Sequence, residues 1–146
     1  MAAMLTGTLA LLAAAMFSGA ALYINLAEQP ARMTLDDNAL LKQWKPSYKR
    51  GFAMQSSLAI AGFLLGMAAW WQSGISLFIV GGLLMIANWP WTLIAIMPTN
   101  NTLQAIDPAS GDQRIRPLVA KWNNLHVVRT ILSSLACVSF VVALAN

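Results

Sequence analysis

The stretch GFAMQSSLAIAGFLLGMAAWWQSGISLFIVGGLLMIANWPWTLIAIMPTNNTLQAI, residues 51–106, decides the fold because it contains no Asp, Glu, Lys or Arg. A charged side chain near the middle of a bilayer is costly, so long uncharged apolar runs are typical of membrane-spanning helices. One spanning helix needs about 20 residues, and this stretch is long enough for two. Its natural turn is Gln72-Ser73-Gly74. We therefore predict two spans, at residues 52–71 and 75–97.

The same pattern extends over the rest of the chain. All five acidic and all nine basic side chains fall within residues 28–50 and 107–129, and both ends of the chain are uncharged. The sequence therefore predicts one domain, residues 1–146, folded as an all-α, up-down bundle of four transmembrane helices. The predicted spans are 2–27, 52–71, 75–97 and 125–144, with loops at 28–51 and 98–124.

The distribution of positive charge predicts the orientation in the membrane. Both predicted loops carry Lys and Arg, whereas the turn at residues 72–74 carries none. The positive-inside rule then places the loops in the cytoplasm and both termini on the non-cytoplasmic side. Residues 1–26 lack the basic start of a signal peptide and are expected to be retained as a helix. We expect an integral protein of the bacterial inner (plasma) membrane.

Composition limits the partners that the chain can have. Hydrophobic residues make up 58% of the chain and charged residues 10%, which excludes an ordinary soluble domain. The net charge of +4 lies beside the predicted spans, so nucleic acid is not an expected partner. Membrane lipid and a hydrophobic aromatic small molecule are the expected partners. An oligomer is compatible with the sequence.

The first predicted loop has a helical pattern of its own. Thr34 followed by Asp37 resembles a capping box, and a short surface helix over residues 35–45 would end at Pro46. The apolar side of this helix would face the headgroup region. It comprises Leu40, Leu41 and Trp44.

The unusual polar side chains of the spans gather near their cytoplasmic ends, whereas the outer half offers only hydroxyl groups such as that of Ser133. This one-sided distribution predicts a pocket that opens toward the cytoplasm. The polar and aromatic residues concerned are Tyr23, Asn25, Glu28, Gln55, Asn88, Trp89, Trp91, Thr92, His126, Arg129 and Thr130.

The segment Asn88-Trp-Pro-Trp-Thr92 is the most specific part of this group. Asn88 lies about 13 Å inside the predicted end of its span, at 1.5 Å per residue, which is deep for an amide. Pro90 supplies no N–H, so the carbonyl of Ile86 loses its partner and a kink is expected. Two indoles beside a kink could form a flat aromatic wall. Alternatively, Asn88 bonds a neighbouring helix and the indoles fill space.

Three ionisable side chains, Glu28, His126 and Arg129, are placed to face the bundle at its mouth. One interpretation is a Glu28–Arg129 ion pair with a structural role. The other makes His126 a base that Glu28 orients, because the reference pKa of histidine lies near neutrality. Cys137 follows eleven residues after this single histidine, about 16 Å away along a helix. A catalytic metal site needs about three protein ligands, so none is predicted.

Six short motifs together resemble one family. They are Ala21–Pro30 (ALYINLAEQP), Gln43–Pro46 (QWKP), Tyr48–Gly51 (YKRG), Asn88–Thr92 (NWPWT), Met97–Asn100 (MPTN) and Trp122–His126 (WNNLH) with Arg129. Across nearly its whole length the chain is similar to the anthrone oxygenase-like family of small four-helix membrane proteins, much of which is known only as a domain of unknown function. The resemblance implies a membrane bundle. It also implies an oxygenase that needs no recognised metal or flavin cofactor.

Two functions follow as hypotheses. In the first, the chain is an enzyme that oxidises an anthrone, or another activated polycyclic or quinol-like aromatic, with O₂. In the second, it is a non-catalytic membrane protein that binds a quinone-like or lipid-like ligand or stabilises a partner, and its polar cluster joins helices.

The enzymatic hypothesis assigns a role to each candidate residue. His126 would be the base, oriented by Glu28. The developing oxyanion would be stabilised by Arg129 and Asn88. The remaining candidates would bind the substrate, its rings lying between Trp89, Trp91 and Tyr23, with Thr92, Asn25 and Gln55 completing the site.

Overall fold

The computed structural model describes residues 1–146 and consists of four long helical rods without any strand, as the all-α prediction requires. Each rod is long and apolar enough to cross a membrane. The first comprises α1 (Ala2–Tyr23), a π-helical turn (Ile24–Glu28) and α2 (Gln29–Arg32); the second is α3 (Asp37–Ser73). The third comprises α4 (Leu77–Ile86), α5 (Asn88–Trp91), a π-helical turn (Thr92–Ile96) and α6 (Met97–Ala105), and the fourth is α7 (Ile115–Ala145) after a 3₁₀ turn (Pro108–Ser110).

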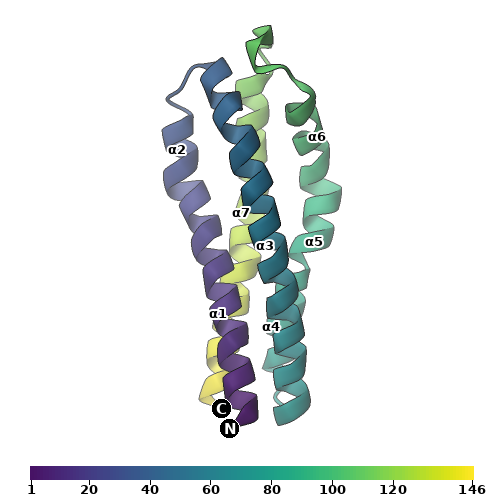
Figure 1. Ribbon diagram of the computed structural model, residues 1–146. Coiled ribbons are helices and arrows are strands. Elements are labelled where there is room, and N and C mark those ends of the chain that lie inside the picture. The colour runs from purple at the N-terminus through teal and green to yellow at the C-terminus, as the bar shows by residue number, and fades with distance from the viewer.

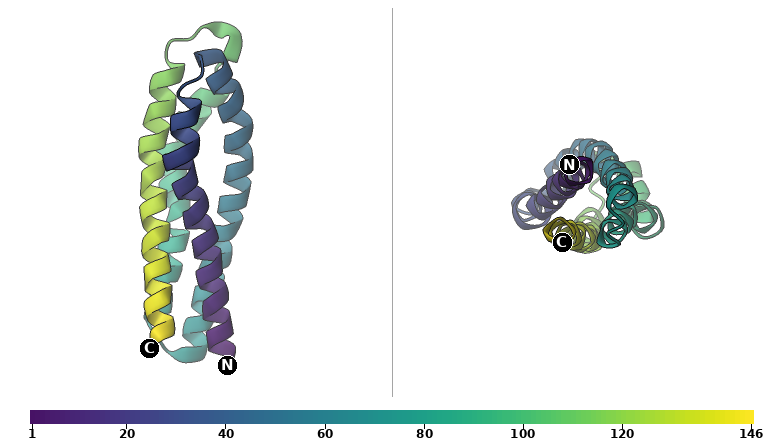
Figure 2. Two further views of the ribbon diagram at one scale, coloured as in Figure 1. Left: turned by 90° about the vertical axis from the view of Figure 1, so that its left-hand side faces the viewer. Right: turned by 90° about the horizontal axis from the view of Figure 1, so that it is seen from below.

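The rods lie side by side along one long axis (Figures 1 and 2). Both termini lie at one end of the bundle, together with the short turn between α3 and α4 (Figure 1). The two charged connections lie at the opposite end (Figure 1). Helix α1 packs against α3 and α7, and α4 packs against the same two helices.

The helices continue well beyond the predicted spans at the charged end. Residues 28–51 and 98–124, predicted as loops, are mostly helical, and the non-helical connections shrink to residues 33–36 and 106–114, with one 3₁₀ turn in the second. The reason is a second apolar cluster at this end, in which side chains of the two charged windows and of the adjoining residues 96–106 bury one another rather than face headgroups. Its buried members are Leu40, Leu41, Trp44, Ile96, Leu103, Ile106, Ile115, Val119 and Trp122.

Two local predictions about the start of the second rod are wrong. Asp36, not Thr34, caps α3, because its carboxylate accepts a hydrogen bond from the Ala39 N–H at 2.9 Å. The Thr34 hydroxyl instead donates back to the Ala31 carbonyl at 2.8 Å. Pro46 does not end a helix but lies inside α3. The buried Trp44 just before it packs in the second apolar cluster, and this packing offsets the hydrogen bond that the proline removes.

Two other prolines each follow a widened helical turn. Pro30 comes two residues after the π-helical turn Ile24–Glu28, and Pro98 comes two residues after Thr92–Ile96. A proline ring collides with the carbonyl four residues earlier in a regular helix, and a wider turn relieves that collision. Such turns are rare in proteins overall, and those that occur often lie at functional sites. Both lie beside polar groups of the bundle interior.

The helices pack closely through glycines at the end that holds the termini. A Cβ atom on Gly66 would lie 3.2 Å from the Cα of Gly82, so α3 and α4 approach through small residues. The first apolar cluster fills this end, with Phe17, Phe78, Met85 and Phe140 as its large members. The bundle thus has two apolar cores, and the stretch between them holds a group of buried polar side chains.

Candidate functional site

A layer of polar side chains separates the two apolar clusters. Along α7 it runs from His126 to Ser133, between Trp122 of one cluster and Ala136 of the other. Polar groups buried at such a depth need partners or a ligand. The buried members are Gln55, Asn88, Thr92, His126, Arg129, Thr130 and Ser133, and Asn25 reaches them from the first π-helical turn.

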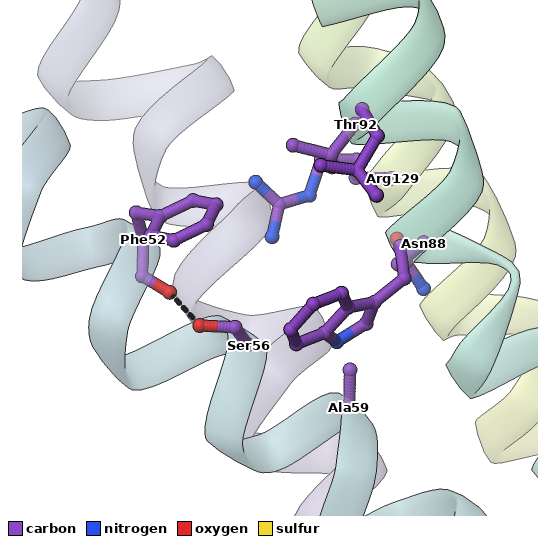
Figure 3. Close-up of a pocket in the computed structure, with 8 residues that line it drawn as sticks. Phe52, Ser56, Ala59, Asn88, Thr92 and Arg129 are labelled. Carbon is purple, nitrogen blue, oxygen red and sulfur yellow. Dashed lines mark hydrogen bonds between the residues drawn. The ribbon is translucent and has the colours of Figure 1, made fainter. Parts of the chain in front are cut away.

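A narrow pocket of about 20 Å³, room for about one water molecule, opens beside this layer (Figure 3). It lies between α3 on one side and α5 with the second π-helical turn on the other. The exposed Leu93 and the partly exposed Phe52 and Ser56 form its rim, so this pocket opens on the flank of the bundle and not at its charged end. Its eight lining residues are Phe52, Ser56, Ala59, Asn88, Trp89, Thr92, Leu93 and Arg129.

Arg129 is the dominant group in this pocket. Its guanidinium points into the pocket toward α3 (Figure 3), although the residue is only 6% exposed. It forms no hydrogen bond and no ion pair with any side chain, and the closest aromatic contact places its Cζ 5.2 Å from the ring of Phe17. A buried cation without a counter-ion is costly to the fold. The pocket therefore offers a free positive charge to a ligand oxygen.

Asn88 and Trp89 add unpartnered polar atoms to the same wall. The Asn88 amide donates to the carbonyls of Leu84 and Met85 at 3.2 and 3.0 Å, within its own rod, and not to a neighbouring helix. Its carbonyl oxygen Oδ1 and the indole Nε1 of Trp89 are buried without partners. The break between α4 and α5, expected from Pro90, falls at Ala87 and presents these side chains.

His126 lies one helical turn from Arg129, outside the pocket wall, and is held by the first π-helical turn. Its Nδ1 lies 3.3 Å from Oδ1 of Asn25, which also accepts a hydrogen bond from the Thr130 hydroxyl at 2.6 Å. The Asn25 amide nitrogen donates to Oδ1 of Asn123 at 2.7 Å, so the orientation of this amide is assigned by its partners. Nδ1 must then carry the proton, which leaves Nε2 with a free lone pair.

Glu28 does not meet either of its expected partners. It forms an ion pair with Arg32 and accepts hydrogen bonds from Ser47 and, at 3.0 Å, from Gln43. The predicted Glu28–Arg129 ion pair is therefore wrong. The first rod continues past residue 27, which places Arg32 one helical turn from Glu28. Asn25, and not Glu28, orients His126.

The three expected ring-binding residues are not brought together. The indole of Trp91 turns away from the pocket and donates to the Leu125 carbonyl at 3.0 Å. Tyr23 is 62% exposed and lies in a separate groove between α1 and α3. Gln55 is buried near the pocket but does not line it, and its Nε2 has no partner. Of Trp89, Trp91 and Tyr23, only Trp89 lines the pocket.

The sequence prediction missed the α3 side of the pocket. Phe52, Ser56 and Ala59 line it, and their spacing of four and then three residues puts them on one helical face. That spacing could have indicated the wall, although serine and alanine give no chemical signal. No three His, Cys, Asp or Glu side chains come together anywhere in the chain as metal ligands would.

Comparison with known proteins places this geometry in a family. Residues 44–139 match the family model described as anthrone oxygenase, and they include every residue of the pocket. An anthrone oxygenase from Claviceps purpurea is 30% identical over 83% of this chain and 75% of its own length. Two further fungal anthrone oxygenases are similar. The one from Paecilomyces divaricatus is 24% identical over 79% of this chain and 80% of its own length. The one from Aspergillus novofumigatus is 31% identical over 67% of this chain and 67% of its own length. No solved structure matches the chain. The chain belongs to the anthrone oxygenase family.

Proposed function

We propose that the protein is an integral membrane oxygenase that converts an anthrone, or a similarly activated aromatic ketone, into a quinone with O₂. The proposal rests on one observation, the unpaired guanidinium of Arg129 inside a pocket walled by Phe52 and Trp89. A flat aromatic ligand can stack on such rings once the side chains that line this narrow pocket move apart. The oxygen of that ligand would lie against the guanidinium.

The reaction follows from the acidity of an anthrone. Removal of one methylene proton sends the electron pair toward the ketone oxygen, where Arg129 stabilises the negative charge. The carbanion form reduces O₂, a C–O bond forms at the same carbon, and the protonated peroxide loses water to leave a carbonyl group. One anthrone and one O₂ thus give one anthraquinone and one water.

We assign the role of base to His126. The Asn25 network leaves its Nε2 unprotonated, which is the form that a proton acceptor needs. Its place one helical turn from Arg129 puts it beside the pocket rather than in the wall, so the ligand would have to reach past the guanidinium.

The test is oxygen uptake by the purified protein in detergent with anthrone supplied, for the wild type and Arg129→Leu. We expect uptake above the spontaneous rate, with one O₂ consumed per anthrone. Loss of one oxyanion donor lowers kcat by about 10²–10³-fold, and the variant should fold as well as the wild type because it loses a buried, unpaired charge. Arg50→Leu, an exposed arginine outside the pocket, is the matched control.

Equal uptake in the wild type and Arg129→Leu would contradict the role of the guanidinium. Uptake at the spontaneous rate in every sample would contradict the enzymatic proposal. The second hypothesis, ligand binding without turnover, would then be tested by quenching of tryptophan fluorescence with anthraquinone.

We also propose how the bundle lies in its membrane. The chain would form an up-down bundle with the charged connections in the cytoplasm and both termini on the other side, because all basic side chains lie toward the charged end. The pocket would then open sideways into lipid, so that a hydrophobic substrate arrives from the bilayer. The named relatives are fungal and give no support to the bacterial inner membrane expected from the sequence.

A further inference from the structure

Tyr48 lies directly next to the pocket wall, one helical turn from Phe52 on α3. Its ring stacks on Trp44 with the centroids 5.0 Å apart and the planes at 1°. On its other side it tilts against Phe52 at 5.9 Å. Trp44 is itself fully buried, so the phenol has a fixed position at the end of an aromatic series that leads into the pocket.

The hydroxyl of Tyr48 donates only one weak hydrogen bond. It donates to the thioether sulfur of Met97 at 3.9 Å, and a thioether is a poor acceptor. Such a contact is easily exchanged for a charged oxygen, to which hydrogen bonds are shorter and stronger.

Further buried polar side chains lie near this hydroxyl. Asn100 of α6 is 1% exposed and interacts with the Tyr48 hydroxyl without a well-aligned hydrogen bond, and its two amide atoms have no other partner. Arg129 of α7 lines the same pocket as Phe52, whose ring Tyr48 contacts. The third and fourth rods therefore each place a buried polar side chain, Asn100 and Arg129, in the neighbourhood of Tyr48. A buried polar group without a well-formed protein hydrogen bond can bind a ligand oxygen.

We propose that the Tyr48 hydroxyl is a second hydrogen-bond donor, beside Arg129, to the anionic oxygen of the bound aromatic ketone. This inference rests on the proposed function for its ligand. Deprotonation of the ligand by the base moves negative charge onto its oxygen, and a neutral phenol can stabilise that charge without giving up its own proton. Tyr48 would exchange Met97 for the ligand oxygen.

The experiment measures ionisation of the ligand without turnover. Anthrone is bound to the detergent-solubilised protein in the absence of O₂, and the visible absorbance of its anion is followed against pH for wild type, Tyr48→Phe and Tyr23→Phe. We expect wild type to ionise bound anthrone at a lower pH than free anthrone. Tyr48→Phe keeps the stacked ring but should raise this midpoint by about one pH unit, a tenfold change. The control Tyr23→Phe alters an exposed tyrosine and should match the wild type.

A second variant should shift the ionisation midpoint of bound anthrone in the opposite direction. The chain has two tyrosines, so Tyr48 is the single tyrosine of the Tyr23→Phe protein. Incorporating 3-fluorotyrosine there makes the phenol a stronger donor, and the midpoint should fall below that of the unfluorinated protein. An unchanged midpoint in both Tyr48→Phe and the fluorinated protein would overturn the proposal.

The outcomes also separate this inference from the proposed function. If Tyr48→Phe titrates like the wild type while the wild type consumes O₂, the Tyr48 role is wrong and the function stands. If the wild type lowers the midpoint through Tyr48 but consumes no O₂, the donor role stands and the oxygenase proposal is wrong. If the wild type neither lowers the midpoint nor consumes O₂, both are wrong.

Discussion

At the residue scale, the pairing of His126 with Asn25 determines which ring nitrogen can act as a base. His126→Gln removes that nitrogen but can keep a hydrogen bond to Asn25, so the protein should remain folded. General base catalysis contributes about 10²–10⁴-fold, and we expect the variant to lose turnover within that range. The measurement is the initial rate of O₂ uptake at saturating anthrone, repeated with anthrone deuterated at the methylene carbon.

Thr130→Val is the matched control for this variant. It removes the other donor to Oδ1 of Asn25 and leaves Nδ1 of His126 as the remaining one, so Nε2 stays unprotonated. We expect turnover close to that of the wild type. A normal rate in His126→Gln would exclude the imidazole as the base and would direct attention to groups that line the pocket.

Single residues also mark the limit of what the sequence could predict about the site. Asn88, Thr92 and Arg129 were expected to gather, and they share the pocket wall, because buried polar groups of a bundle collect at one depth. The partner of Glu28 was predicted wrongly, since the choice between Arg32 and Arg129 depends on how far the first rod continues. A single sequence therefore predicts how deep a polar side chain lies in the bundle better than it predicts which side chain that group pairs with.

At the element scale, the sequence predicted the number of helices but not their ends. Uncharged runs identify the segments that a bilayer tolerates, whereas a helix can continue beyond them wherever it still buries apolar side chains. Leu40, Leu41 and Trp44 face Ile115 and Val119 in this way. The charge pattern therefore predicts the membrane boundary, whereas the second apolar cluster decides where the helices end.

The break at Ala87 gives an element-scale prediction, because it sets the direction in which Asn88 and Trp89 point. Pro90→Ala supplies an N–H and allows a regular helix through α4 and α5. We expect the melting temperature not to fall, since proline inside a helix costs about 3 kcal/mol or more. Affinity for anthraquinone should fall, because a straight helix turns both side chains away from Arg129. Circular dichroism and fluorescence quenching measure the two effects.

Pro46→Ala is the control for helix straightening. Pro46 lies inside the continuous helix α3 and outside the pocket wall, so its removal should leave affinity unchanged. If Pro90→Ala binds anthraquinone as tightly as Pro46→Ala does, the kink does not shape the pocket.

At the scale of the whole molecule, the position of the pocket is related to the uneven distribution of charge along the bundle. The pocket lies in the polar layer between the two apolar cores and opens on the flank of the bundle, so a ligand dissolved in lipid could reach Arg129 without crossing the charged end. The same asymmetry leaves the end with both termini free of charged side chains (Figure 1). An oxygenase of this design would take up a hydrophobic substrate directly from the bilayer.

This arrangement depends on an orientation that cysteine labelling can measure. Cys137 is the single cysteine, so Cys137→Ser provides a background without thiols. Ser76 precedes α4 at the end with the termini, makes no capping hydrogen bond and is exposed; Ser110 is exposed in the charged connection. In sealed right-side-out vesicles, a membrane-impermeant maleimide should label the Ser76→Cys protein at once and the Ser110→Cys protein only after detergent is added. The reverse order would place the basic connections outside, against the positive-inside rule. Labelling of both proteins before detergent would mean that the bundle does not span the bilayer in one orientation.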